Sequence, residues 1–239
     1  MYVIGSILII PAMIFGFWAS SNVSSTFNRF GQIPSAMGMT GAQLARRLLD
    51  QNGCMHVAIE RTPGHLSDHY DPRKKVVRLS PDVHDSTSLA ALGVAAHEVG
   101  HAIQDHTGYF PLKLRQLVVK TTSLINKALL PLIVIGILTS IFLTAFMPAD
   151  AWFWLIVGLC VMYGLSFLIN VITLPTEYDA SNRAKKMLQD GHLFDNAEYN
   201  AVSRVLRAAA LTYVAGLVTS LAFLLRFLGL LLMLLGRRR

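Results

Sequence analysis

The sequence predicts a mainly α-helical integral membrane bundle that carries a small α+β part at the membrane surface. Hydrophobic residues make up 53% of the 239 residues, charged residues make up 15%, and the mean hydropathy is +0.48, which is too apolar for an ordinary soluble domain. The apolar residues also gather in runs of about the 20 residues that a helix needs to cross a bilayer. A polar segment with mixed helix and strand patterns separates these runs.

The apolar runs divide the chain into five segments. Residues 1–20 are expected to form a transmembrane anchor, 21–127 a cytoplasmic region, 128–174 a transmembrane hairpin, 175–207 a second polar segment, and 208–239 a C-terminal transmembrane or interfacial helix. Because only three residues join the two apolar runs of the hairpin, the chain must return to the side that it left. Both polar segments are therefore expected on one face of the membrane.

Basic residues predict which face this is. Twelve Lys and Arg residues lie between Arg29 and Lys127, five lie between the third and fourth apolar runs, and the tip of the hairpin has none. By the positive-inside rule both polar segments face the cytoplasm. Because cytoplasmic loops account for the net charge of +7, no nucleic-acid partner is expected. Arg226 and the arginines at the C-terminus conflict with a complete fourth crossing, so either the rule is overridden or the chain after Arg226 turns back or lies along the interface.

The polar region begins with a helix and two strand-like pieces. Thr40 and Gln43 have the capping-box spacing, and the apolar spacing that follows them predicts an amphipathic helix ending at Asn52. Residues 55–60 and 75–80 are typical of short strands, and the segment between them is rich in turn residues. These pieces predict a small hairpin or an edge strand. The two cysteines of the chain indicate no disulfide framework.

A second helix is predicted over residues 87–107, capped by Asp85 or Ser86. One face of this helix is apolar and predicts a core contact, through Leu89, Leu92, Ala96, Val99 and Ile103. The opposite face holds His97, His101 and Asp105. One side is therefore committed to packing, while the other presents nitrogen and oxygen ligands.

That polar face contains the sequence His-Glu-Val-Gly-His from His97 to His101, an H-E-x-x-H motif. Histidines four residues apart on a helix lie one turn apart on one face, so both can bind a single Zn²⁺ at about 2.1 Å. The intervening Glu98 can hold a water molecule and act as the general base. Zinc lowers the pKa of the water that it binds to about 7. The motif predicts a zincin-like catalytic part that hydrolyses peptide bonds.

The third zinc ligand is predicted to be Glu177. The hairpin returns the chain to the face of His97 just before Pro175, which suits the first turn of a helix. Small residues at positions 180 and 181 would let this helix approach the H-E-x-x-H helix closely, whereas Asp179 projects away and is expected at the surface. Glu198 is a weaker candidate because it fits a capping box with Asp195.

Four segments of the chain resemble those of a known family: residues 68–72, residues 77–80, the extended motif at 95–104, and residues 174–181. Through them the chain resembles the YugP-like neutral zinc metallopeptidases of bacteria over nearly its whole length. The order H-E-x-x-H, two-span hairpin, E-x-x-A is also similar to the membrane gluzincins that include HtpX and the CAAX prenyl peptidases. In that group an Asp typically follows the ligand Glu by four residues and contacts a histidine, whereas this chain has Ser181.

The departure at Ser181 leaves the partner of the ligand histidines unassigned, and Asp105, one turn after His101, is a candidate for it. His192 and Tyr178 are candidate donors to an oxyanion. The resemblance also implies that the strand containing Val77, Arg78 and Leu79 is a substrate edge, where an extended peptide could add by main-chain hydrogen bonds, with an ordinary hairpin as the alternative.

The sequence thus predicts an integral membrane zinc metalloendopeptidase of the bacterial plasma membrane, with one Zn²⁺ per chain and an active site facing the cytoplasm. Its expected partners are membrane lipid and a peptide or membrane-protein substrate, and a regulatory membrane partner is left open. Two alternatives remain at this point. One is a non-catalytic zinc-binding adaptor or scaffold, which would need a fourth protein ligand. The other is a hydrolase that acts on a lipid amide.

Overall fold

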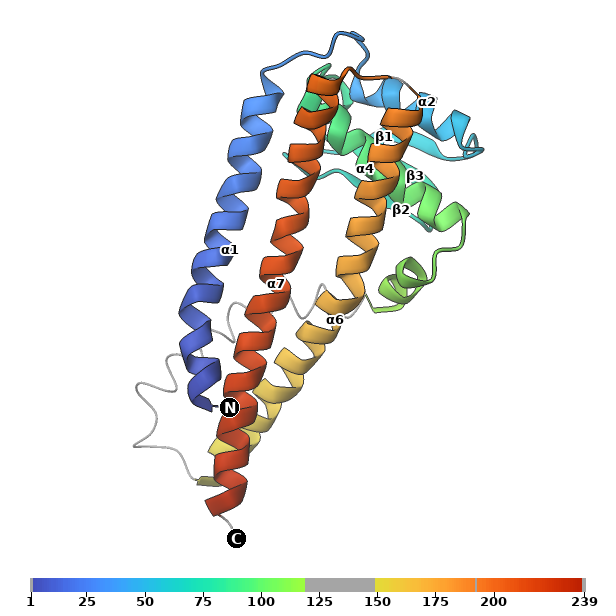
Figure 1. Cartoon of the computed structure of the whole chain (residues 1–239). Coiled ribbons are helices and arrows are strands. Elements are labelled where there is room, and N and C mark those ends of the chain that lie inside the picture. Colours follow the sequence, from blue (N-terminus) through green and yellow to red (C-terminus); the bar gives the residue numbers. More distant parts are fainter. Residues whose placement is uncertain (1, 119–148, 192, 238–239) are drawn as a thin grey trace. The chain divides into compact units, whose positions relative to one another are not determined.

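The computed structural model describes residues 2–118, 149–191 and 193–237. Most of these residues are helical, and three helices are long: α1 (Tyr2–Gly31), α6 (Ala149–Asp190) and α7 (Asn196–Arg237) (Figure 1). Each of the three contains an apolar stretch long enough to cross a membrane. Together with a small sheet, they give the predicted fold class, a mainly helical membrane protein with a small α+β part.

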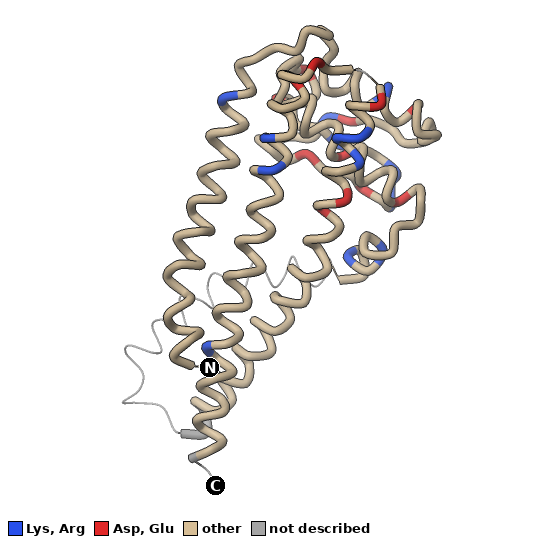
Figure 2. Tube along the Cα trace, viewed as in Figure 1, with Lys and Arg blue, Asp and Glu red and all other residues tan. Residues whose placement is uncertain are grey.

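The chain divides into two compact units, and the three long helices contribute to both. Unit 1 consists of Met1–Phe17, Leu114–Thr173 and Val214–Arg239, and unit 2 consists of Trp18–Lys113 and Leu174–Tyr213. Charged residues of the described chain lie mostly in unit 2, and the apolar stretches of α1, α6 and α7 carry few of them (Figure 2). The polar chemistry of the protein is therefore concentrated in unit 2.

In unit 1 the long helices bury a cluster of apolar and aromatic side chains, formed by Ile9, Ala12, Leu159, Tyr163, Ala222, Phe223 and Phe227. The Tyr163 ring stacks on Phe223 at a centroid distance of 4.9 Å. Helix α7 runs unbroken past Arg226 to Arg237, so the turn after Arg226 that the charge pattern left open is absent from the described chain. The predicted second span, residues 128–147, lies outside the described residues.

The helices of unit 2 follow the predicted pattern, with one correction. Helix α2 (Gly41–Gln51) has the full capping box between Thr40 and Gln43. Helix α4 (Leu89–His106) begins later than predicted, because Ser88, and not Asp85 or Ser86, accepts the bond from Ala91 N–H. The preceding residues instead form a short helix, α3 (Pro81–His84), with Pro at its first position.

The sheet of unit 2 has three strands, β1 (Ala58–Arg61), β2 (His69–Asp71) and β3 (Val76–Leu79), in the order β1-β3-β2. Strand β1 pairs in parallel with β3, and β2 pairs with β3 in an antiparallel hairpin. Val77, Arg78 and Leu79 therefore lie in the central strand, and the prediction that this strand is an open edge is wrong. The reason is that residues 69–71, which were expected to be a turn, form a strand of their own.

Helices α2 and α4 pack together over the sheet and share one apolar core. The apolar face predicted for α4 is buried in this core: Leu89, Leu92, Ala96, Val99 and Ile103 are each at most 7% exposed. Burial of one complete side-chain face fixes the rotation of α4 about its axis. The polar face of α4 consequently turns toward the residues of α6 that belong to unit 2.

Candidate metal centre

Helix α4 supplies two imidazoles to the candidate site. His97 and His101 lie one helical turn apart, and their rings meet edge to face with centroids 4.8 Å apart. The His101 residue is 7% exposed and the His97 side chain 15% exposed. Their positions follow directly from the four-residue spacing and from the burial of the opposite face of the helix.

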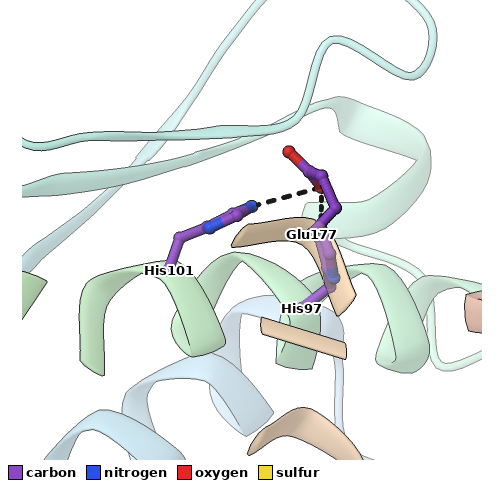
Figure 3. Close-up of side chains that lie close together, drawn as sticks. All are labelled: His97, His101 and Glu177. Carbon is purple, nitrogen blue, oxygen red and sulfur yellow. Dashed lines mark hydrogen bonds and ion pairs between the residues drawn. The ribbon is translucent and has the colours of Figure 1, made fainter. Parts of the chain in front are cut away.

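Helix α6 brings the Glu177 carboxylate to these imidazoles, 80 positions along the chain from His97. Glu177 Oε2 lies 3.1 Å from His97 Nε2 and 3.5 Å from His101 Nε2 (Figure 3). The three ligand atoms lie within 4.8 Å of one another, and Glu177 is only 1% exposed. No other group of three such residues is found in the described parts of the chain.

The distances from the Glu177 carboxylate to the two imidazoles fit a tetrahedral zinc ion. Ligand bonds of about 2.0–2.1 Å at tetrahedral angles place neighbouring ligand atoms about 3.3–3.4 Å apart. The two Nε2–Oε2 distances, 3.1 and 3.5 Å, fall on either side of this value. Two imidazole nitrogens and one carboxylate oxygen are also a donor set that zinc prefers, with one position left for water.

A close contact between helix backbones positions Glu177. If Gly100 had a Cβ atom, it would lie 2.5 Å from the carbonyl oxygen of Ala180 and 3.2 Å from its Cα. The small side chain of Ala180 and the absence of a side chain at Gly100 therefore allow α4 and α6 to touch, as the sequence predicted for position 180. Glu177 lies one turn before this contact and so faces the histidines.

Proline 175 occupies a different place from the one predicted. Helix α6 is continuous from Ala149 to Asp190, so Pro175 lies inside the helix and not in its first turn. Glu177 is consequently an internal residue of a long helix. Its position is set by packing against α4 and not by attraction to a helix N-terminus.

The other ring nitrogen of each histidine also has a partner. Ser181 Oγ lies 3.2 Å from His97 Nδ1, and Gln104 Oε1 lies 2.9 Å from His101 Nδ1. Gln104 also donates to Asp179 Oδ2, which accepts a second bond from Arg183. The prediction that Asp179 is merely a surface charge is therefore wrong. Gln104 is not among the predicted site residues, although its position three residues after His101 places it on the same helix face.

Asp105, the candidate partner of a ligand histidine, has other partners in the structure. Its Oδ2 atom accepts hydrogen bonds from Tyr70 Oη at 2.7 Å and from Lys75 Nζ at 2.6 Å. Burial, and then the neighbouring Asp105 carboxylate, raise the pKa of the Tyr70 phenol, so that it remains a donor. Asp105 therefore ties α4 to the β2–β3 hairpin, and the contacts with the histidines belong to Ser181 and Gln104.

The remaining candidates have less defined surroundings. Glu98 follows His97 on α4 and is buried, at 7% exposure. Tyr178 is 44% exposed. His192, the other candidate donor to an oxyanion, lies outside the described residues.

A His-His-Glu cluster that could hold a metal ion, in a mainly helical chain with three potential membrane spans, is the arrangement expected of a membrane metalloprotein. Comparison with known families is more specific. Residues 5–232 match the family described as "Putative neutral zinc metallopeptidase", and the chain belongs to this family. It is 40% identical over 223 residues to the "Putative membrane protease YugP" of Bacillus subtilis (strain 168). The aligned residues cover 92% of this chain and 93% of that protein. No solved structure matches the chain.

Proposed function

We propose that the protein is an integral membrane zinc metalloendopeptidase of the gluzincin type, with one zinc ion per chain. The observation that carries this proposal is the convergence of His97, His101 and Glu177, whose ligand atoms lie within 4.8 Å of one another although they come from two helices far apart in the sequence. Three protein ligands leave one coordination position for water or substrate, which is the usual arrangement of a catalytic zinc site.

In this proposal each residue has one role. When bound, the zinc ion polarises the scissile carbonyl and makes water more acidic. His97, His101 and Glu177 hold the ion. Glu98 acts as the general base: its carboxylate accepts a proton from the attacking water and passes it to the nitrogen of the leaving amine. The place of Glu98 directly after the ligand His97 in the H-E-x-x-H motif supports this role, because that spacing is typical of a carboxylate that acts on a metal-bound water.

The proposed substrate is a peptide or a segment of a membrane protein, and the active site is proposed to face the cytoplasm. The charge pattern supports this orientation, since the polar segments on both sides of the hairpin are rich in Lys and Arg. Three apolar helices in the described chain, and a relative with "membrane protease" in its name, support a multi-pass protein in a bacterial plasma membrane.

Zinc content and a pair of glutamate variants test this function. We expect the purified full-length protein in detergent to hold about one zinc ion per chain and to cleave casein. The Glu98→Gln variant should keep the zinc and lose hydrolysis. Glu60→Gln is a matched control, because the Glu60 side chain is 54% exposed and pairs with Arg78 in the sheet.

The outcomes separate the proposal from its alternatives. Hydrolysis that survives in Glu98→Gln contradicts the role of Glu98 as general base. A wild-type protein that holds zinc through a fourth protein ligand and cleaves nothing is the adaptor or scaffold. Cleavage of lipid amides without cleavage of casein indicates the lipid hydrolase.

A further inference from the structure

Gln104 connects the two helices that supply the ligands, and it is fully buried, at 0% exposure. Its Oε1 atom lies 2.9 Å from His101 Nδ1. Its Nε2 atom donates to the carbonyl oxygen of Thr176 at 2.7 Å and to Asp179 Oδ2 at 2.8 Å. One amide thus makes three hydrogen bonds, one to α4 and two to α6.

The two bonds to α6 fix the orientation of this amide. A backbone carbonyl can only accept, and Asp179 Oδ2 already accepts a hydrogen bond from Arg183 Nε at 2.6 Å. If the amide were turned over, its oxygen would face two acceptors and both bonds to α6 would be lost. The NH₂ group of Gln104 must therefore face α6, and the oxygen must face His101.

The orientation of the Gln104 amide in turn determines which ring nitrogen of His101 carries the proton. Because Gln104 Oε1 only accepts, the proton of the His101 ring lies on Nδ1. The lone pair then lies on Nε2, the nitrogen that is 3.5 Å from Glu177 Oε2. This is the tautomer that a zinc ligand at Nε2 requires.

The same amide also bonds to the residue next to the third ligand. Thr176 immediately precedes Glu177, and its carbonyl is bound to Gln104 on the other helix. A change at Gln104 would therefore affect both the imidazole of His101 and the backbone turn that carries the Glu177 carboxylate.

We propose that Gln104 is a positioning residue of the metal centre: it selects the Nδ1–H tautomer of His101 and ties the ligand-bearing turn of α6 to α4, with Asp179 and Arg183 fixing its amide. This inference rests on the proposed function, because it assumes that the cluster binds zinc. It assigns to Gln104 no contact with the substrate or the reacting atoms.

Zinc affinity, measured on the full-length protein in detergent by competition with a fluorescent chelator, tests the proposal. Gln104→Met has a similar length but no hydrogen-bonding amide, and it should weaken zinc binding about 10- to 100-fold, the usual effect of losing the partner of a ligand histidine. Gln51→Met is the control, because Gln51 is an exposed residue at the end of α2. It should bind zinc as the wild type does.

A double variant that exchanges the carboxylate and the amide of positions 179 and 104 distinguishes a positioning role of Gln104 from a role in packing alone. In Gln104→Glu combined with Asp179→Asn, a carboxylate still accepts from His101 and the new amide at position 179 can donate to it. This double variant should bind zinc about 10-fold more tightly than Gln104→Met. A merely structural glutamine predicts no such recovery.

Several results would overturn the inference. One is a folded Gln104→Met that binds zinc within about threefold of the wild type, well short of the loss expected for a ligand partner. Another is a folded double variant that binds no better than Gln104→Met. If Gln104→Met does not fold, nitrogen–proton correlation spectra of zinc-loaded wild type labelled in histidine decide, since a His101 proton on Nε2 contradicts the proposal. A wild-type protein that binds no zinc refutes the proposed function itself, so the two failures are distinguishable.

Discussion

Replacing Gly100 with alanine should separate the two helices that supply the metal ligands. The added Cβ would lie 2.5 Å from the Ala180 carbonyl oxygen, whereas ordinary contacts begin at 3.4 Å. The atoms must therefore move apart by about 0.9 Å, the difference between these two distances. The obstacle is backbone, so a side-chain rotation cannot relieve it. Because Glu177 lies three residues before Ala180 on α6, much of this displacement should reach its carboxylate.

The expected effect falls on zinc affinity more than on stability. Metal–ligand distances tolerate only about 0.2 Å of deviation, so a shift several times larger should lower zinc affinity by at least about 10-fold. Overpacking costs about 1–3 kcal/mol, but alanine favours the helix over glycine by about 1 kcal/mol. The free energy of unfolding should then fall by no more than about 2 kcal/mol.

The assay is chelator competition on purified protein, with thermal unfolding measured in parallel. Gly93→Ala is the matched control on the same helix, because a Cβ there would meet only side-chain atoms of Val202 and Val205, the nearest being Val202 Cγ1 at 3.1 Å. It should leave zinc affinity unchanged. Equal zinc affinity for Gly100→Ala and Gly93→Ala would refute the argument that the backbone contact positions Glu177.

Three other substitutions test separate parts of unit 2. Ser181→Ala removes the hydroxyl 3.2 Å from His97 Nδ1 and should lower zinc affinity by about 10-fold; an unchanged affinity in chelator competition would contradict that contact. Thr40→Ala removes one half of the capping box with Gln43 and should destabilise the protein by about 1 kcal/mol, seen as a lower Tm, and an unchanged Tm would count against it. Burial raises the pKa of the Asp68 carboxyl, so the native state binds this proton more tightly than the unfolded state does. Protonation of Asp68 therefore stabilises the fold at low pH. This stabilisation is lost as the pH rises from the ordinary pKa of Asp through the raised pKa. Wild-type Tm should therefore fall relative to that of Asp68→Asn across this window, and a constant difference between the two would show that the pKa is not raised.

Local sequence patterns were sufficient to predict the features that depend on residues within one helix. The capping box at Thr40 and the apolar face of α4 are properties of neighbouring residues, and the structure contains both. The place of Glu177 beside His97 and His101 could also be expected, because the predicted hairpin would return the chain to the same face. In these cases spacing or connectivity alone restricts the geometry.

Interactions between distant elements could not be predicted in the same way. Strand β2 has only three residues, too few for a periodic pattern, and its pairing makes β3 a central strand instead of an edge. Asp179 was assigned to the surface from its angle on a helical wheel, which takes no account of a long side chain on the facing helix. Its contact with Gln104 depends on the close packing at Gly100, which only the tertiary structure shows.

Proline 175 gives the ligand-bearing helix a local weakness. Proline has no amide hydrogen, so the carbonyl four residues earlier, at Val171, loses its normal partner within α6. A helix that lacks one rung of its hydrogen-bond ladder bends more easily at that point. Since Glu177 comes only two residues later, bending at this joint would swing its carboxylate while the apolar part of α6 kept its own internal bonding.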